Sequence, residues 1–296
     1  MKLKDLIMEY FGSYEFKNLR EDTKKQYVYF LSVLTDSRLN DSKIGNYQLK
    51  NISTKMCKVV YKDWCERGVS LANHVLSVSK IAINYAIDME YMKVNPFRSV
   101  KKQTTKPRKV VWTKEDIQTF LEVAYSNFET RNVGLIAQMA YEWCQRLGDM
   151  RMLTWSNLDL EAKTMHIEQS KRRAEVFLPI SDGLTKMLLQ QKQDYGFQKY
   201  VAPRPKPYRG EYQPYSLFKL PLLARKVMNL ASLSDELRLS DLRRTGTTEM
   251  VDAGVSMANI MSVTGHANPQ SVKPYMKHTL ASASLALNMR NNLTEN

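Results

Sequence analysis

The chain has 296 residues, enough for two domains, and its 43% hydrophobic and 25% charged residues are typical of a folded globular protein. Its formal charge of +14 indicates a polyanionic partner, DNA or RNA first, although a basic protein without such a partner is the alternative. The sequence shows no secretion-type leader, no apolar run of about 18 residues and no metal-type spacing of Cys or His. We therefore expect a cytoplasmic protein that is not bound to a membrane.

Helices are predicted in the N-terminal part, because apolar residues recur there at spacings of three and four. They cover residues 5–11, 21–34, 54–67 and 72–89. The Asn95-Pro96 pair ends the last helix, since a residue before proline avoids the α region. Residues 95–110 then lose periodicity and gather Lys and Arg, which is typical of a solvated linker. We expect a helical domain over residues 1–107, with a basic linker from about residue 95, and a second domain over residues 108–296.

The second part mixes helices with a short sheet. Thr113, followed by acidic residues, predicts a helix start, and further helices are predicted over residues 133–153. The β-prone segments 164–168 and 176–180 flank a basic stretch and predict a hairpin with a basic tip. Residues 195–215, rich in Pro, Tyr and Arg, predict a long loop, after which the chain returns to helix.

Several motifs in the second part together resemble a known family. No glycine-rich phosphate loop or paired-carboxylate motif is present, so nucleotide hydrolysis and two-metal nuclease chemistry have no support. The segments QRLGDMRMLTWSNLDL, KRR, LSDLRRTG and TGH, followed by Tyr275, resemble in order and spacing the catalytic domain of tyrosine recombinases and phage integrases. The likeness runs from about residue 112 to the end, and the N-terminal part is more weakly similar to their core-binding domain.

The resemblance implies a mainly α fold. A helical core-binding domain would be joined to an α+β catalytic domain with a small antiparallel sheet, and the two would close as a C-shaped clamp on duplex DNA. The core-binding domain would begin almost at the first residue, without the arm-binding domain of many phage integrases.

The first motif contributes Arg146 and Asp149, which lie three residues apart on one face of the predicted helix. By resemblance, Arg146 is the first catalytic arginine and Asp149 supports it. A planar guanidinium can hold two non-bridging phosphate oxygens at once, which lysine cannot do. Taken alone, the pair would be interpreted as an exposed ion pair of little energetic value.

The predicted hairpin tip carries Lys171, Arg172 and Arg173. A leaving 5′-oxygen needs a proton, and an arginine pKa above about 12 makes that side chain a poor donor. Lys171 is therefore predicted as the general acid, in a turn where the family also places a lysine. Arg172 and Arg173 are predicted to bind DNA, and three solvated charges are the alternative for this segment on its own.

The LSDLRRTG motif matches the family's His-x-x-Arg pattern at Arg243, the second catalytic arginine, and it departs from that pattern at Ser240, where histidine is usual. Serine can donate a hydrogen bond to phosphate or cap a helix that begins at Asp241, and the cap is the interpretation we favour. It cannot exchange a proton near neutral pH. The base that takes the tyrosine proton is therefore open, with His266 or water as substitutes, and Arg244 is predicted to contact DNA.

His266 and Tyr275 complete the predicted site. His266 follows Gly265 at a predicted helix end, 23 residues after Arg243 and 9 before Tyr275, which reproduces the family spacing. Tyr275 is one of 16 tyrosines, and its position alone singles it out as the nucleophile. Such a tyrosine needs no metal when arginines neutralise the phosphate, and the phosphotyrosyl bond lets rejoining proceed without ATP. Pro274 predicts a break, with a new short helix from Tyr275.

The resemblance implies a site-specific recombinase, without metal or cofactor, that integrates or excises a mobile element through a 3′-phosphotyrosyl intermediate. It implies a homotetramer on two duplex DNA sites in a bacterial cell, with an accessory DNA-bending protein or excision factor as a further partner. The amphipathic tail over residues 281–292 would dock on a neighbouring subunit or on its own domain. The basic linker would bind DNA through Lys101, Lys102, Lys106, Arg108 and Lys109.

Two other functions fit part of the sequence. One is a DNA-binding relative that kept the fold and lost catalysis, for which Ser240 is the sequence evidence. The other is a type IB topoisomerase, which shares the chemistry but relaxes supercoils; the recombinase-like N-terminal domain and the short length argue against it.

Overall fold

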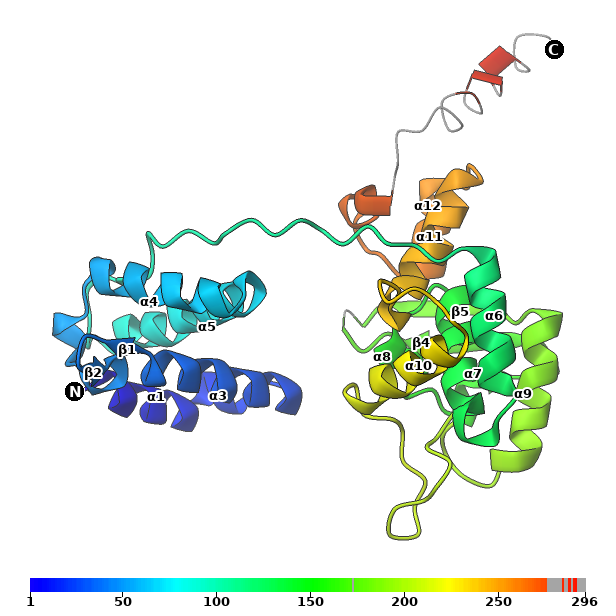
Figure 1. Ribbon diagram of the computed structural model, residues 1–296, viewed down its shortest axis with the longest axis horizontal. Helices are drawn as coiled ribbons and strands as arrows, with labels where there is room; N and C mark the ends of the chain where they lie inside the picture. The colour runs from blue at the N-terminus through cyan, green and yellow to red at the C-terminus, as the bar shows by residue number, and fades with distance from the viewer. Residues whose placement is uncertain (172, 276–283, 285–286, 289, 292–296) are drawn as a thin grey trace. The chain divides into compact units, whose positions relative to one another are not determined.

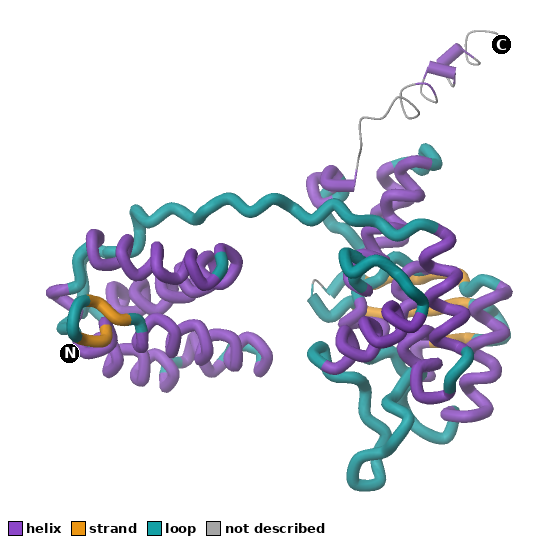
Figure 2. The backbone as a smooth tube through the Cα atoms, viewed as in Figure 1, coloured by secondary structure: helices purple, strands orange, loops and turns teal. Residues whose placement is uncertain are grey.

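The computed structural model describes residues 1–171, 173–275, 284, 287–288 and 290–291 (Figure 1). The chain divides into two compact units, Met1–Arg108 and Lys109–Asn296. Helices dominate both units, and the strands form two small antiparallel sheets (Figure 2). The predicted mainly α fold with a small antiparallel sheet is confirmed. In the part of the chain so described, no helix has the length and apolar character needed to cross a membrane.

The first unit contains the predicted helices and a short hairpin that the sequence did not predict. Its helices are α1 (Leu3–Gly12), α2 (Tyr14–Lys17), α3 (Glu21–Asp36), α4 (Thr54–Arg67) and α5 (Val69–Asp88). The hairpin pairs β1 (Arg38–Leu39) with β2 (Ser42–Lys43), and the 3-10 turns η1 (Ile44–Asn46) and η2 (Leu49–Asn51) follow it. Gly68 separates α4 from α5 at a φ of +139°, a value that glycine adopts readily.

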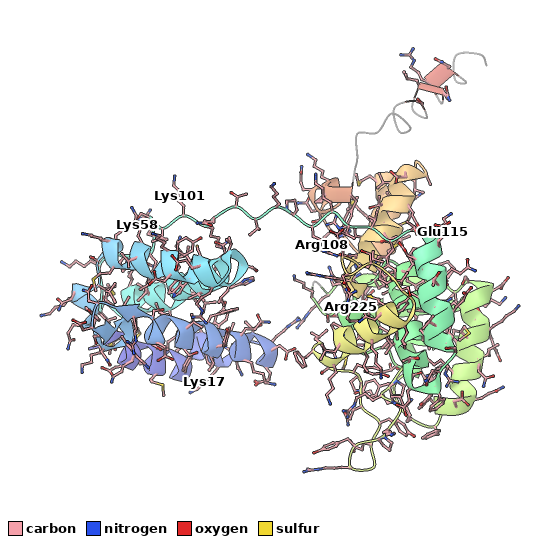
Figure 3. The ribbon with its side chains drawn as sticks, in the orientation of Figure 1. Lys17, Lys58, Lys101, Arg108, Glu115 and Arg225 are labelled. Atoms are coloured by element: carbon pink, nitrogen blue, oxygen red, sulfur yellow. The ribbon has the colours of Figure 1, made fainter. Side chains whose placement is uncertain are left out.

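The segment after α5 packs on the first unit before the chain becomes extended. The Phe97 ring stacks on Trp64 with centroids 6.3 Å apart, and Phe97 and Val100 are buried. The Asn95 amide donates to Asn84 Oδ1 (2.7 Å) and accepts from the Phe97 N–H (2.9 Å). The extended stretch therefore covers residues 101–113 and begins later than the predicted linker. Lys101 and Arg108 lie along it (Figure 3).

The second unit has helices around a three-stranded sheet. The helices are α6 (Lys114–Tyr125), α7 (Phe128–Glu142), α8 (Leu147–Met150), α9 (Asp182–Tyr195), α10 (Lys219–Leu230), α11 (Leu242–Asp252) and α12 (Met257–Thr264). The sheet has the antiparallel order β3 (Leu158–Asp159), β4 (Thr164–Glu168) and β5 (Glu175–Pro179). Met165 and Ile167 alternate with exposed residues and pair with Leu178 and Val176, so one face of the hairpin is in the core. The predicted hairpin and the Thr113 cap of α6 are confirmed.

The helices predicted over residues 133–153 are α7 and α8, which are separate because the chain leaves the α conformation after α7. The prediction that Arg146 and Asp149 share one helix face is wrong, since Arg146 precedes α8. Cys144 has a φ of +51°. The Cys144 N–H donates to the Tyr141 carbonyl (3.1 Å) and the Gln145 N–H donates to the Ala140 carbonyl (3.1 Å). This pair of hydrogen bonds around a left-handed residue is the Schellman helix end, here with cysteine in the place that glycine usually takes. Arg146 is consequently the N-cap residue of the separate short helix α8.

The predicted helix cap at Ser240 is also wrong. Leu239–Asp241 forms a 3-10 turn (η4) that closes when the Arg238 N–H donates to Asp241 Oδ2 (3.0 Å). Asp241, and not Ser240, is the N-cap residue of α11. The α-helix therefore begins at Leu242, one residue later than expected, and Ser240 is exposed.

Candidate active site

Arg146 stands at the start of α8, beside the end of β4. Its guanidinium Nη1 donates to Gln169 Oε1 at 2.7 Å and lies 3.8 Å from Asp149 Oδ2, a distance too long for a hydrogen bond. Asp149 Oδ1 instead accepts from the Ser170 N–H (3.1 Å) in the turn of the hairpin. The side chain of Arg146 is 25% exposed, so the guanidinium is accessible to solvent while the buried Gln169 holds it in position.

Arg243 is a buried cation on the first turn of α11. Its Nη2 donates to the Thr264 carbonyl at 2.8 Å and lies 3.2 Å from His266 Nε2. Its Nη1 has no hydrogen-bond partner among the residues described. Burial above all, and then the neighbouring Arg146, lower the pKa of the Arg243 guanidinium, whereas Tyr275 acts in the opposite direction. Since an arginine pKa begins far above neutrality, the group stays charged.

His266 follows the left-handed residue Gly265 (φ +67°), as predicted, at the end of α12. Its Nδ1 lies 2.7 Å from the Thr264 hydroxyl, and that hydroxyl donates to the Ile260 carbonyl at 2.7 Å. Since the hydroxyl proton is used on Ile260, the hydroxyl accepts from His266 Nδ1–H. These contacts fit the neutral imidazole with its proton on Nδ1 and with Nε2 accepting from Arg243.

Tyr275 is half-buried at the end of the 3-10 turn η6 (Lys273–Tyr275). Its ring centroid lies 6.0 Å from that of His266, and the Arg244 guanidinium carbon lies 5.0 Å from the Tyr275 ring centroid. Arg244, predicted to contact DNA, therefore makes a cation–π contact with the predicted nucleophile. A second 3-10 turn, η5 (Pro269–Ser271), precedes η6, and the helix predicted to start at Tyr275 lies outside the described residues.

Other predicted residues are not joined to this group. Lys171 is exposed in the turn after β4, and neither Lys171 nor Ser240 has a hydrogen bond or ion pair with a described residue. Arg173 is exposed, and its Nε lies 3.9 Å from Glu168 Oε1. Arg172 and most of the predicted docking tail lie outside the described residues. Among the linker cations, Arg108 is half-buried and four are exposed: Lys101, Lys102, Lys106 and Lys109.

Sequence reasoning missed two residues that connect the predicted ones. Gln145 and Gln169 are buried amides next to Arg146 and close to Lys171 in the sequence. Their proximity to predicted site residues is the one signal that could have drawn attention to them. Glutamine has no spacing rule of its own, so this signal is weak.

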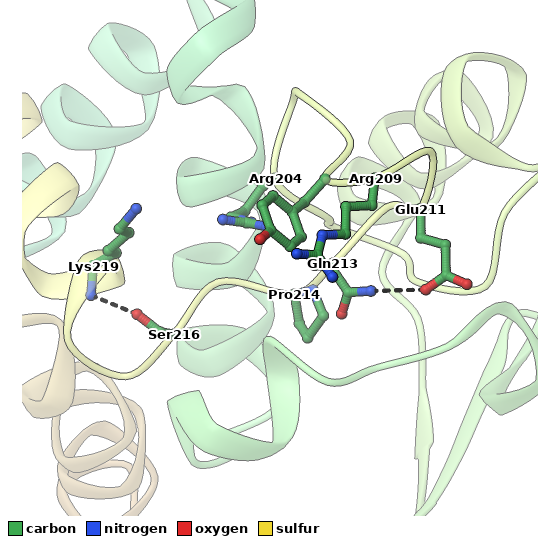
Figure 4. Close-up of a pocket in the computed structure, with 8 residues that line it drawn as sticks. Arg204, Arg209, Glu211, Gln213, Pro214, Ser216 and Lys219 are labelled. Atoms are coloured by element: carbon green, nitrogen blue, oxygen red, sulfur yellow. Dashed lines mark hydrogen bonds between the residues drawn. The ribbon is translucent and has the colours of Figure 1, made fainter.

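Two further features bear on what the site can bind. Across the described residues, no group of three His, Cys, Asp or Glu side chains is arranged to hold a metal ion. A cavity of about 550 Å³ lies in the loop between α9 and α10 (Figure 4). It contains none of the predicted site residues and is lined by Arg204, Tyr208, Arg209, Glu211, Gln213, Pro214, Ser216 and Lys219.

The group Arg146, Arg243, His266 and Tyr275 has the chemistry needed for phosphoryl transfer. Two guanidinium groups can stabilise the negative charge that builds up on the non-bridging oxygens of a phosphodiester under attack. A phenol beside them can serve as a nucleophile, and an imidazole can exchange a proton near neutral pH.

Most of the second unit matches a known protein family, and the chain is similar in fold to several solved structures. The model of the phage integrase family matches residues 111–281. A lambda integrase dimer bound to a COC′ core site superposes with a TM-score of 0.76 at 18% identity, over 94% of this chain and 77% of that chain. A lambda integrase tetramer bound to a Holliday junction gives a TM-score of 0.77 at 16% identity, over 94% of this chain and 78% of the other.

A third similar structure is the Tn1549 transposon integrase in complex with a circular intermediate DNA. It has a TM-score of 0.77 at 15% identity, over 98% of this chain and 99% of that chain. At such identities the likeness shows the fold alone. Among curated proteins, no sequence matches this one significantly.

Proposed function

Because the chain belongs to the phage integrase family, whose model matches more than half of its length, we propose that it is a site-specific tyrosine recombinase. It would cleave and rejoin DNA strands and so integrate or excise a mobile element. The observation that carries this proposal is Arg243, a buried cation whose Nη1 has no hydrogen-bond partner in the described part of the chain. Arg131, Arg151 and Arg204 also have buried nitrogens without a hydrogen-bond partner among the described residues, so Arg243 is distinguished by its place beside Arg146 and Tyr275, where an anionic ligand would supply the missing acceptor.

In the proposed reaction the Tyr275 oxygen attacks the scissile phosphorus and the bond to the 5′-oxygen breaks. The products are a 3′-phosphotyrosyl bond and a free 5′-hydroxyl, so one phosphoester replaces another and no ATP is consumed. Arg146 and Arg243 would hold the non-bridging oxygens, and Asp149 would support Arg146 through the hairpin turn. Lys171, exposed on that turn, would give its proton to the leaving 5′-oxygen.

Ser240 stands where the family usually has histidine, so another group must accept the Tyr275 proton. A serine hydroxyl does not take up a proton near neutral pH, whereas the His266 ring adjoins the Tyr275 ring at 6.0 Å. His266 Nε2 is an acceptor in the DNA-free protein, where Arg243 donates to it. We assign the base to His266, acting directly or through one water molecule.

Duplex DNA and further copies of the chain are the proposed partners. The similar lambda integrase structures contain a dimer on a core site and a tetramer on a Holliday junction. By analogy, residues 1–107 would serve as the core-binding domain and residues 108–296 as the catalytic domain, both gripping one duplex within a homotetramer on two sites. The exposed linker cations would contact backbone phosphates, which fix position but carry no sequence information.

Detection of the covalent intermediate tests the proposal. The recombination site would first be selected from randomised duplexes that the protein retains. A nick beside the cleavage position then traps the covalent adduct, which runs as a protease-sensitive shifted band on a denaturing gel. We expect the adduct with wild type and with Tyr200→Phe, a half-buried tyrosine outside the candidate site, and none with Tyr275→Phe. Absence of the adduct in wild type, or its persistence in Tyr275→Phe, would refute the proposal.

A DNA-binding relative without catalytic activity is the second candidate, because Ser240 is exposed and has no hydrogen bond or ion pair in the described chain. The same gel separates the two. Such a relative would retain the selected duplex in a native binding assay and give no adduct with wild type.

A further inference from the structure

Two buried amides connect the cations of the candidate site. Gln145 and Gln169 are both 0% exposed. Gln169 Nε2 donates to Gln145 Oε1 at 2.6 Å and to the Thr264 carbonyl at 2.9 Å, and its Oε1 accepts from Arg146 Nη1 at 2.7 Å. Gln145 Nε2 donates to the carbonyls of Trp143 (2.8 Å) and Val263 (2.7 Å).

The orientation of both amides is determined by these contacts. Each NH₂ group uses its two hydrogens on two oxygens, and each amide oxygen accepts from a donor. Turning the Gln169 amide over would bring its NH₂ against the Arg146 guanidinium and its oxygen against the Thr264 carbonyl. The Gln169 oxygen is therefore held toward Arg146, and a buried polar network satisfied in this way is rigid.

The same contacts join the two arginines through one peptide group. The Thr264 carbonyl accepts from Gln169 Nε2 at 2.9 Å and from Arg243 Nη2 at 2.8 Å. The Thr264 hydroxyl also accepts from His266. Arg146, Arg243 and His266, which come from three separate elements, thus share a support at the end of α12.

Gly265 leaves space for the Gln169 amide, which with Gln145 bridges Arg146 and the Thr264 carbonyl. A Cβ atom at this position would lie 2.6 Å from Gln169 Nε2, and the residue has a φ of +67°. A side chain here would therefore displace the amide as well as strain the backbone.

We propose that Gln169 is a positioning residue, which Gln145 holds in place and which fixes the Arg146 guanidinium relative to Arg243 for phosphate binding. The proposal rests on the proposed recombinase function. Gln169 would not touch DNA, since it is buried; it acts through Arg146. Its neutral oxygen orients the guanidinium without cancelling the charge that the phosphate requires.

The test replaces Gln169 by methionine, which has a similar length and neither donates nor accepts strongly. The matched control is Gln191→Met. Gln191 is a buried amide in the same unit that donates to Asn132 Oδ1 (2.9 Å) and the Val201 carbonyl (2.8 Å), away from the site. Both variants lose a buried amide, so a general cost to stability should be comparable in the two.

The measured quantities are the rate of adduct formation at saturating nicked DNA and the Kd for the same DNA. We expect Gln169→Met to slow adduct formation by about 10- to 100-fold, as misplacement of a catalytic group does, with the Kd nearly unchanged. Gln191→Met should cleave at the wild-type rate. In the double variant with Arg146→Lys, the Gln169 change should add less than about twofold, because both act on one group.

The proposal would be overturned if Gln169→Met formed the adduct at the wild-type rate. It would also be overturned if the rate losses of Gln169→Met and Arg146→Lys multiplied in the double variant. If Gln169→Met does not fold, Gln145→Met tests the bridge from its other end, and undiminished cleavage there would also overturn it. If wild type forms no adduct, the recombinase function fails by itself. Crystal structures of wild type and Gln169→Met then decide the positioning role, which an unmoved Arg146 guanidinium would disprove.

Discussion

Replacement of Arg243 by methionine should separate activity from stability. The side chain is buried, and its Nη1 lacks a hydrogen-bond partner within the described residues, a defect that costs about 1–3 kcal/mol. Its Nη2 hydrogen bonds to Thr264 and His266 contribute about 1.5–3 kcal/mol each, because the donor is charged. Methionine removes both the cost and the gain; the Thr264 carbonyl still accepts from Gln169, whereas His266 Nε2 loses its donor. The free energy of unfolding should therefore fall by no more than about 3 kcal/mol.

Cleavage should respond very differently. Loss of one preorganised donor to a transition-state oxygen typically lowers a rate by about 10² to 10³, or about 2.7–4 kcal/mol. Urea unfolding followed by circular dichroism measures the first quantity, and adduct formation on nicked DNA at saturation measures the second.

Arg131 provides a control with the opposite expectation. Like Arg243, it has buried nitrogens without a hydrogen-bond partner in the described chain (Nε and Nη2), but its charge is balanced within the protein: Nη2 lies 2.7 Å from Asp194 Oδ2, and the guanidinium carbon lies 4.9 Å from the Phe128 ring centroid. Arg131→Met should lower stability by about 1 kcal/mol and leave cleavage unchanged. The reasoning would be refuted if Arg243→Met lost more than about 3 kcal/mol of stability or slowed cleavage less than about tenfold.

Three other substitutions test separate features of the site. Ser240→His should raise the rate of adduct formation about tenfold near pH 7, because it adds a proton acceptor. A dependence of that rate on pH identical to that of wild type would contradict this. Gly265→Ala should lower the free energy of unfolding by about 1–3 kcal/mol, through backbone strain and displacement of the Gln169 amide. Gly210→Ala, with a φ of +82° and no described neighbour within 4 Å, should lower it by about 1 kcal/mol through strain alone. Equal losses in the two variants would exclude a contribution from the clash with Gln169. Arg244→Met should slow adduct formation several-fold, since the cation packs on Tyr275. The slope of the logarithm of the DNA-binding constant against the logarithm of the salt concentration should stay unchanged. A slope shallower by about 1 would instead identify a phosphate contact.

Local pattern was sufficient to predict the hairpin but not the helix end before Arg146. The hairpin has alternating apolar residues in both strands, so its register follows from which face is buried. The end of α7 lacks glycine, and Cys144 adopts the left-handed conformation where α11 packs. A Cβ at Gly246 would lie 2.6 Å from Cys144 Sγ and 2.7 Å from the Tyr141 carbonyl, so close packing by a residue about one hundred positions away accompanies the turn.

The site was predicted in part for a related reason. Arg146, Arg243 and His266 could be chosen because their motifs resemble a family in order and spacing, and the structure brings them near one another. The supporting amides could not be chosen, because their role depends on contacts between residues 145, 169 and 264, which no local spacing reveals. The prediction of Arg244 as a DNA contact did not anticipate that Tyr275 would lie against it.

The partners of the cations explain how the protein can hold a concentrated positive charge ready for phosphate. Arg146 donates to an amide oxygen, and Arg243 donates to a peptide carbonyl and contacts an imidazole nitrogen. These acceptors are neutral, so they orient the guanidinium groups without neutralising them. The carboxylate of Asp149 lies 3.8 Å from Arg146 and uses its other oxygen on the Ser170 N–H. A carboxylate bound directly to either arginine would compete with the phosphate, and an unsupported arginine would have to be ordered when DNA arrives. Neutral acceptors avoid both costs, which is the physical reason for expecting an amide rather than an acid at residue 169.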